Sequence, residues 1–211
     1  MLISFDIICK YIAQLNLNIT GILHVGAHEC EELNDYVRNG ITEDNIIWID
    51  AIKEKVELAK SKNIKNIYNE VVSNKEEEVT FNITNNGQSS SIFDLETHKI
   101  HHPEINVVEK RLLTTTTLEA FFKKNNINPT KYNFWNFDIQ GAELFALQGA
   151  GSILDNVDIL YLEVNTEHLY KGCSLLPELD EFLHSKNFHR VAIEMTFANW
   201  GDALYINKRN L

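Results

Sequence analysis

Short apolar runs alternate along the chain with longer stretches in which apolar residues recur every three or four positions. The runs at 22–27, 45–51, 66–73, 131–141 and 157–165 have the length and composition of buried strands. Between and after them, amphipathic periodicity predicts helices at 29–40, 53–63, 117–126, 142–154 and 176–187. This β-α alternation predicts an α/β fold with an open, mostly parallel sheet and helices on both of its faces.

Both ends of the chain depart from that alternation. Residues 188–196 and 200–208 are two β-rich runs separated by four residues, which predicts a hairpin that adds one antiparallel strand at or near an edge of the sheet. The first 20 residues have apolar positions at helical spacing and predict a docked amphipathic helix. Residues 78–84 alternate as a half-exposed strand, whereas 93–111 show no periodicity and predict no regular element.

Composition is that of an ordinary globular protein. Of 211 residues, 44% are hydrophobic and 23% charged, and no Ser/Gly-rich linker interrupts them. We therefore expect a single domain over 1–211, with the N-terminal helix within 1–20 and a core at 22–206. The apolar runs are far shorter than the ~20 residues that span a bilayer. Three cysteines without metal-ligand spacing indicate a reducing, cytoplasmic compartment, and abundant Asn, Ile and Lys suggest an AT-rich bacterial or large-virus genome.

The charge balance lowers the expectation of a nucleic-acid substrate. The chain has 19 basic and 30 acidic residues, a net charge of -11, and its only sizeable charge run is acidic. Proteins that bind nucleic acid usually present a basic face, because neutralising phosphates provides much of their affinity.

The segment HVGAHECEE (24–32) predicts a ligand site where a strand ends, turns at Gly26 and leads into a helix. Glycine lets a ligand approach the main chain, and a helix N-terminus attracts a carboxylate or phosphate. One glycine stands where a dinucleotide fingerprint has three, and Glu29, Glu31 and Glu32 would repel a pyrophosphate. A zwitterionic amino-acid moiety fits better; an ordinary strand–helix turn is the alternative.

Asp50 ends the next strand, 24 positions beyond Gly26. An acidic residue at this place can accept both hydroxyls of a ribose that lies across the strand ends. The alternative is an N-cap for the helix that follows.

Two further strands end in carboxylates, Asp138 in FDIQGAELFAL and Glu163 in YLEVN, with Asn165 close behind. Two carboxylates at neighbouring strand ends could act as a general base, orient a sugar diol or hold a divalent cation, and capping is the alternative for each.

His98, His101 and His102 in HKIHHPE lack a fourth ligand and the spacing of a metal site, so no metal is predicted. A substrate contact or a base role remains open for them, beside a solvated loop.

Eight segments together resemble the FkbM family of methyltransferases, from Ile22 to Ile206. DIQGAEL, which resembles the family's D-x-E-G-A-E, is the most specific of them. The segments are, in order, ILHVGAHECEE, IIWIDA, VVSNKEEEVTFNI, GQSSSIFD, TTTTLEAF, NFDIQGAELFALQGA, ILYLEVN and WGDALYI.

The resemblance implies a class I, Rossmann-like methyltransferase fold, S-adenosylmethionine as cofactor, and methylation of hydroxyls on sugars or other natural products. In this reading Gly26, Ala27 and His28 line the methionine moiety, Asp50 holds the ribose, and Asp138 lies beside the methyl-transfer centre. The full cofactor site that it implies comprises His24, Gly26, Ala27, His28, Asp50, Ala51, Ile52, Val71, Val72, Ser91 and Asp138, with Ser89 and Ser90 nearby.

The sequence departs from the family's pattern at four positions. His24, His28 and Cys30 replace the frequent Asp, Asn and Gly of the first motif, and Gln140 replaces the frequent acid before Gly141. Because of the first two replacements, the cofactor contacts that the side chains at 24 and 28 make in the family do not carry over directly to this sequence. The last removes one carboxylate from any metal or base proposal.

We therefore expect an O-methyltransferase that acts on a small-molecule or glycan hydroxyl, with Asp138 as base or orienter and Glu163 or His102 as alternatives. Rival hypotheses are an NAD(P)-dependent Rossmann oxidoreductase, a non-catalytic cofactor-binding module and, last, a nucleic-acid methyltransferase. The sequence leaves the oligomeric state open, a homodimer included.

Overall fold

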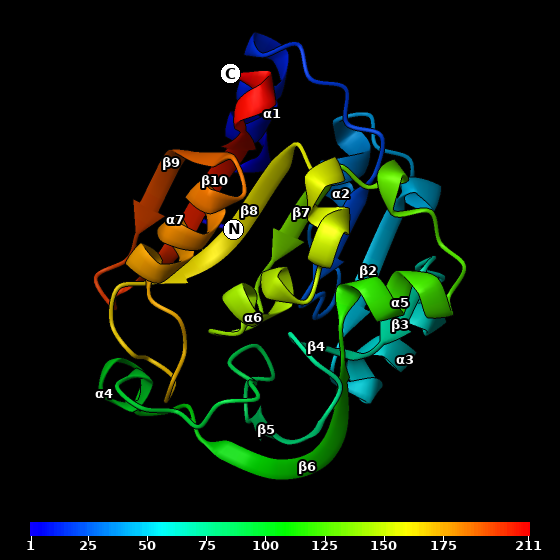
Figure 1. The fold of residues 1–211 in the computed structure, drawn as a ribbon. Helices are drawn as coiled ribbons and strands as arrows, with labels where there is room; N and C mark the ends of the chain where they lie inside the picture. Colours follow the sequence, from blue (N-terminus) through cyan, green and yellow to red (C-terminus); the bar gives the residue numbers. More distant parts are fainter.

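The computed structural model of the protein describes residues 1–211 and is built around a seven-stranded sheet with the order β3-β2-β1-β7-β8-β10-β9 (Figure 1). All neighbouring strands pair in parallel except β10, which is antiparallel to both β8 and β9. The strands are β1 (Ile22–Val25), β2 (Ile46–Asp50), β3 (Ile67–Asn69), β7 (Phe134–Phe137), β8 (Ile159–Asn165), β9 (Phe188–Met195) and β10 (Trp200–Asn207). The predicted α/β fold with a C-terminal antiparallel strand is confirmed, and that strand lies one place inside the edge.

Helices cover both faces of the sheet, because successive side chains of each strand point to opposite sides. In β1, Ile22 packs with α1 (Phe5–Gln14), α2 (Leu33–Arg38) and α3 (Lys53–Ser61). Leu23 joins the core on the other face, under α5 (Leu118–Lys124), α6 (Glu143–Gln148) and α7 (Leu176–Ser185). Four short 3-10 helices lie at Glu43–Asn45, Pro129–Lys131, Gly151–Asn156 and Lys208–Asn210. None of the helices combines the length and the hydrophobicity that a membrane crossing requires.

A second, three-stranded sheet with the order β4-β6-β5 lies below the carboxyl ends of the main strands (Figure 1). It consists of β4 (Val71–Val72), β5 (Glu78–Thr84) and β6 (Val107–Thr116), and α4 (His98–His101) lies between its last two strands in sequence. The expectation that 93–111 holds no regular element is wrong for α4 and for the start of β6. Most side chains of β6 are at least partly exposed, so its sequence carries little hydrophobic alternation.

Three other predicted elements are altered. The helix expected at 142–154 is divided into α6 and the 3-10 helix Gly151–Asn156. The single strand expected at 66–73 is divided at Glu70: β3 stays in the main sheet, and β4 pairs with β6 in the second one. The helix expected at 29–40 begins only at Leu33. Residues before it form turns, with φ of 44° at His28 and 58° at Cys30, so no helix N-terminus faces the turn at Gly26.

Candidate functional site

Two adjoining cavities open where the parallel strands β1, β2, β7 and β8 end, the place at which open α/β sheets bind ligands. They enclose about 550 Å³ and about 1480 Å³ of empty space, part of it open to solvent. Gly26, His28, Gln88 and Asp138 line both cavities and so mark the boundary between them. A ligand that spans this boundary would present one end to each cavity.

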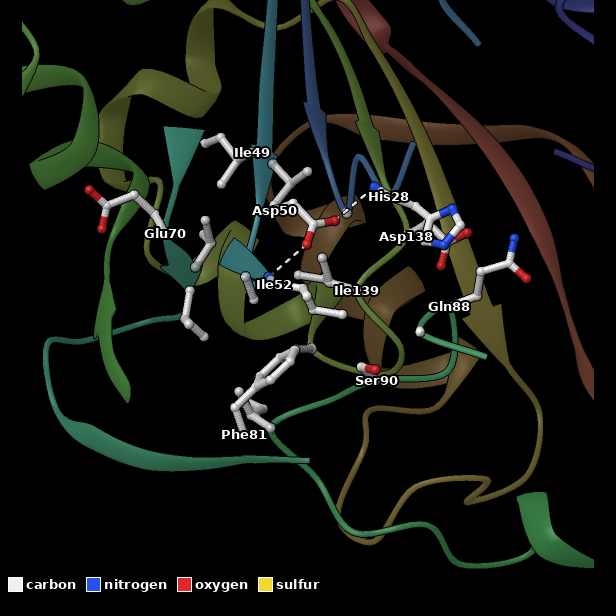
Figure 2. A pocket seen from close by; sticks show the side chains of 18 residues that line it. His28, Ile49, Asp50, Ile52, Glu70, Phe81, Gln88, Ser90, Asp138 and Ile139 are labelled. Carbon is white, nitrogen blue, oxygen red and sulfur yellow. Dashed lines mark hydrogen bonds between the residues drawn. The ribbon is translucent and has the colours of Figure 1, made fainter. Parts of the chain in front are cut away.

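The first cavity is a mostly apolar slot between the two sheets. Ile52 and Ile139 lie on one side, and Phe81, from β5 of the second sheet, faces them from the other (Figure 2). Val71 and Val72 of β4 also line it. Apolar walls of this kind suit a flat purine base, which gains from leaving water.

Asp50 stands in the middle of this slot, between the His28 turn and Ile52 (Figure 2). Its Oδ2 accepts a hydrogen bond from the His28 amide and its Oδ1 one from the Ile52 amide, each at 2.7 Å. Burial raises the pKa of Asp50, while these two hydrogen bonds act against the shift. Each oxygen keeps a further lone pair. Asp50 can therefore fix the backbone around it and still accept the hydroxyls of a ribose.

Gly26 is required by its neighbours rather than by a ligand. Its φ is +90°, and an added Cβ would lie 1.8 Å from the carbonyl oxygen of Asp138. The turns that follow β1 and β7 consequently touch at this glycine. Their contact brings Asp138 to the edge of both cavities.

His28 offers an unsatisfied polar atom at the boundary of the cavities. Its Nδ1 lies 2.6 Å from Glu31 Oε1, whereas its Nε2 is buried without any partner in the protein. Buried polar groups are nearly always hydrogen-bonded, so a lone one that lines a cavity points to a ligand. Together with the apolar slot and Asp50, this atom fits an adenosyl group that extends into a polar tail.

The second cavity contains a cluster of polar side chains around Gln140. The Gln140 Nε2 donates to Asp138 Oδ1 at 2.6 Å and also to Glu163 Oε2, and its Oε1 accepts from the Tyr170 hydroxyl. Burial, with the charge of Asp138 as a second cause, raises the pKa of Glu163 well above its ordinary value. This shift favours the protonated form of Glu163, and Gln140 orients Asp138 beside it.

The turn that carries Gln140 is held by Glu143. The Glu143 Oε1 accepts from the amides of Ile139 at 2.8 Å and Gly141 at 3.4 Å. Within this turn φ is +57° at Gln140 and +95° at Gly141, a conformation that needs such support. Burial raises the pKa of Glu143 to about 8. Glu143 is thus a structural carboxyl that fixes the segment after β7.

His24 belongs to a buried polar group beneath the site. Its Nδ1 lies 3.0 Å from the Tyr36 hydroxyl, which accepts a 2.7 Å hydrogen bond from Asn136 Nδ2. Burial lowers the pKa of His24 and keeps it neutral. His24 lines the second cavity, so it links the core of the sheet to the floor of the site.

The structure brings the predicted site residues together, with one exception. Four of them line the first cavity: Asp50, Ala51, Ile52 and Val72. Four line the second: His24, Ala27, His102 and Glu163. Three line both: Gly26, His28 and Asp138. Ser91 lines neither cavity: its hydroxyl donates to the Gln140 carbonyl at 2.8 Å, while Ser90 and Ser89 take the lining positions.

Sequence reasoning missed the residues that come from outside the strand ends. These residues are Glu70, Phe81, Gly87, Gln88 and Ile92 in the first cavity, and Tyr170, Trp200 and Asp202 in the second. Signals were present in three of the segments that resemble the family. VVSNKEEEVTFNI contains Phe81, GQSSSIFD contains Gly87, Gln88 and Ile92, and WGDALYI contains Trp200 and Asp202. No group of three or more His, Cys, Asp or Glu side chains is arranged to hold a metal ion.

Comparison with known proteins gives one family. The model of the methyltransferase FkbM domain matches residues 24–190. No curated protein matches the chain.

Several solved methyltransferase structures are similar at low identity. TrmK of M. capricolum, in complex with S-adenosyl-homocysteine, has a TM-score of 0.46 and 13% identity, over 97% of this chain and 68% of that one. Magnesium protoporphyrin IX methyltransferase from Synechocystis PCC 6803, with bound SAM, has a TM-score of 0.46 and 9% identity, over 96% and 78%. A SAM-dependent methyltransferase from Aquifex aeolicus has a TM-score of 0.39 and 15% identity, over 93% and 87%. The strand order described above, rather than these distant likenesses, defines the fold.

Proposed function

The chain belongs to the FkbM methyltransferase family, and from that premise we propose that it methylates a hydroxyl group of a sugar, a glycan or another small natural product. S-adenosylmethionine is the cofactor, and when bound it supplies a methyl group on a positively charged sulfur that leaves as a neutral thioether. Because the chain belongs to this family, an NAD(P)-dependent oxidoreductase is no longer a rival hypothesis.

The residues that would hold the cofactor follow from the two cavities. Asp50 would accept the ribose hydroxyls, Ile52, Val72 and Phe81 would enclose the adenine, and the methionine moiety would lie against Gly26, Ala27 and His28. The unpartnered Nε2 of His28 is the polar atom that supports this orientation.

One observation carries the proposal for the acceptor: Asp138 lines both cavities and lies beside a second carboxyl group, that of Glu163, to which Gln140 joins it. The acceptor hydroxyl would donate its hydrogen bond to Asp138, which takes up the proton as the hydroxyl oxygen gains the methyl group. Protonated Glu163 would donate to a neighbouring oxygen of the acceptor. Positioning supplies much of the rate in such a transfer, and Gln140 provides it by holding Asp138 Oδ1.

The test replaces Asp138 by asparagine. Asp138→Asn keeps an oxygen that can accept from Gln140 but removes the base, so we expect methyl transfer to fall by roughly a hundredfold or more. The affinity for S-adenosylhomocysteine should change little. Transfer would be followed as S-adenosylhomocysteine formed with a panel of sugars, and affinity by calorimetry.

The matched control is Asp155→Asn, an exposed aspartate outside both cavities, which should leave both quantities unchanged. Undiminished transfer in Asp138→Asn would remove its assignment as base. Tight S-adenosylhomocysteine binding without transfer to any hydroxyl compound would favour the non-catalytic binding module instead.

A further inference from the structure

The second cavity is strongly one-sided in charge. Its wall includes the carboxyl side chains of Glu31, Glu32, Glu104, Asp138, Glu163 and Asp202. No lysine or arginine lines it, although the chain has 19 of them. An acceptor that enters this cavity therefore meets no lysine or arginine side chain, and the one fixed cation beside the wall is the N-terminal ammonium group of Met1, which acts on Asp202.

Two of the acidic side chains in this wall favour their neutral forms, and a third favours its charged form. Burial raises the pKa of both Glu163 and Asp202, which favours their neutral forms. Burial also opposes ionisation of Glu31, but hydrogen bonds from His28 and from backbone amides outweigh it and hold its pKa below the ordinary value. The two most buried histidines of the wall add no compensating charge, because burial lowers the pKa of His98 to about 4 and also lowers that of His24.

His98 provides a second, independent sign of a ligand in this cavity. Only 6% of it is exposed, and its Nδ1 is buried without a hydrogen-bond partner in the protein. Its ring lies 5.4 Å from that of Tyr170 and 5.1 Å from that of His102, centroid to centroid. A neutral imidazole has one donor and one acceptor nitrogen, which match a hydroxyl group better than an anion.

Aromatic and apolar side chains complete the wall beside these polar groups. Tyr170, Trp200 and Leu169 line the same cavity, and the Tyr170 hydroxyl is already held by Gln140. Aromatic surfaces next to hydroxyl-binding groups suit a sugar ring, whose faces carry C–H bonds and whose edge carries hydroxyls. The carboxyl cluster at Asp138 and the imidazole of His98 then bind two parts of one acceptor.

We propose that this cavity selects a saccharide without negative charge and rejects uronic acids and sugar phosphates. The inference rests on the proposed function, and it names the charge class of the acceptor that the same site takes. Moving an anion from water to a wall in which carboxyl groups outnumber the single terminal ammonium group is unfavourable, whereas neutral hydroxyls can donate to those carboxyl groups.

The test measures binding to the protein saturated with S-adenosylhomocysteine, by saturation-transfer NMR. The probes are methyl hexosides, the corresponding methyl hexuronosides and the corresponding hexose 6-phosphates, matched in ring configuration. We expect neutral glycosides to bind and the anionic ones to bind roughly tenfold more weakly or not at all. Equal or tighter binding of the anionic sugars, or binding of no neutral glycoside at the limit of solubility, overturns the proposal.

Two variants and one control variant test whether the selectivity arises in this cavity. Glu104→Lys at the exposed rim should reduce the difference in affinity between neutral and anionic sugars. Glu96→Lys, the same charge change at an exposed residue outside the cavity, should leave it unchanged. His98→Phe keeps a ring but loses both nitrogens, so neutral glycosides should bind more weakly while the affinity for S-adenosylhomocysteine stays the same.

Formation of S-adenosylhomocysteine with the same sugars distinguishes the two proposals. Faster transfer to anionic sugars than to neutral ones would overturn the charge selectivity and leave the hydroxyl methyltransferase standing. Binding of neutral glycosides without any transfer would overturn the hydroxyl methyltransferase and leave the selectivity of the cavity.

Discussion

At the scale of single residues, the positions chosen from the sequence line one or both cavities, with the exception of Ser91, and several act through their neighbours. Asp50 holds the amides of His28 and Ile52. The N-cap of α3 is Ile52, so the expectation that Asp50 itself caps this helix is wrong. Gly26 was expected to admit a ligand, but the nearest obstacle to a Cβ is the Asp138 carbonyl. A sequence motif can identify the glycine, but the structure is needed to show which neighbouring atom leaves no room for a Cβ.

Gln140 shows the same limit more clearly. In the sequence, Gln140 is notable only because it stands where the family frequently has an acidic residue. In the structure its amide joins Asp138, Glu163 and Tyr170. A carboxylate at this position would add a third acidic group to two that already crowd each other, and it could not donate to either of them.

Glu143 gives a prediction about stability and pH. Its pKa of about 8 in the folded chain exceeds the ordinary 4.5, so the folded form holds a proton that the unfolded form releases. The free energy of unfolding should therefore fall as pH rises from 4.5 to 8, by at most about 1.4 kcal/mol per pH unit, and level off above. Glu143→Gln keeps an oxygen for the Ile139 amide but cannot titrate, so it should lose this slope.

Urea denaturation between these pH values measures the effect. Glu181→Gln, at an exposed carboxyl without a hydrogen bond, is the matched control and should follow the wild-type profile. Parallel profiles for Glu143→Gln and the wild type would show that Glu143 is ionised in the folded chain.

At the scale of elements, long periodic segments were predicted well and short ones were not. The helices α3, α5 and α7 and the strands β2, β9 and β10 lie where the pattern indicated. The strand expected at 66–73 is divided between two sheets, because Val71 and Val72 pair with Thr115 and Thr116 far along the chain. Local periodicity carries no information about that partner.

The second sheet should matter for cofactor binding. Phe81 on β5 is 6% exposed and faces Ile52 and Ile139 across the first cavity. We expect Phe81→Ala to weaken S-adenosylhomocysteine binding roughly tenfold, because an apolar wall of the slot is lost. Calorimetry checks the affinity. Val79→Ala, on the same strand outside the cavity, is the control, and an equal loss in both variants would exclude a direct contact by Phe81.

At the scale of the whole molecule, the first cavity, which we propose as the cofactor slot, lies between two sheets that no paired strands connect. Binding there should tie the second sheet to the first. S-adenosylhomocysteine at about 100 times its dissociation constant should stabilise the fold by about 2.7 kcal/mol. Amide hydrogen exchange should slow most in β4, β5 and the 86–92 segment, and least in the distant strand β9. Protection that is strongest in β9 would place the ligand elsewhere.

The sequence by itself determined the fold class, the antiparallel ending and the residues at the ends of β1, β2, β7 and β8. Hydrophobic period and strand-end chemistry are local properties, and the family resemblance extends over the same segments. The tertiary structure was needed to show that Phe81 faces Ile52 and Ile139 across the slot, that Gln140 joins two carboxyls, and that no lysine or arginine lines the second cavity. These features depend on which distant segments the topology brings together, because each is a contact between residues whose own neighbourhoods in the sequence are unremarkable.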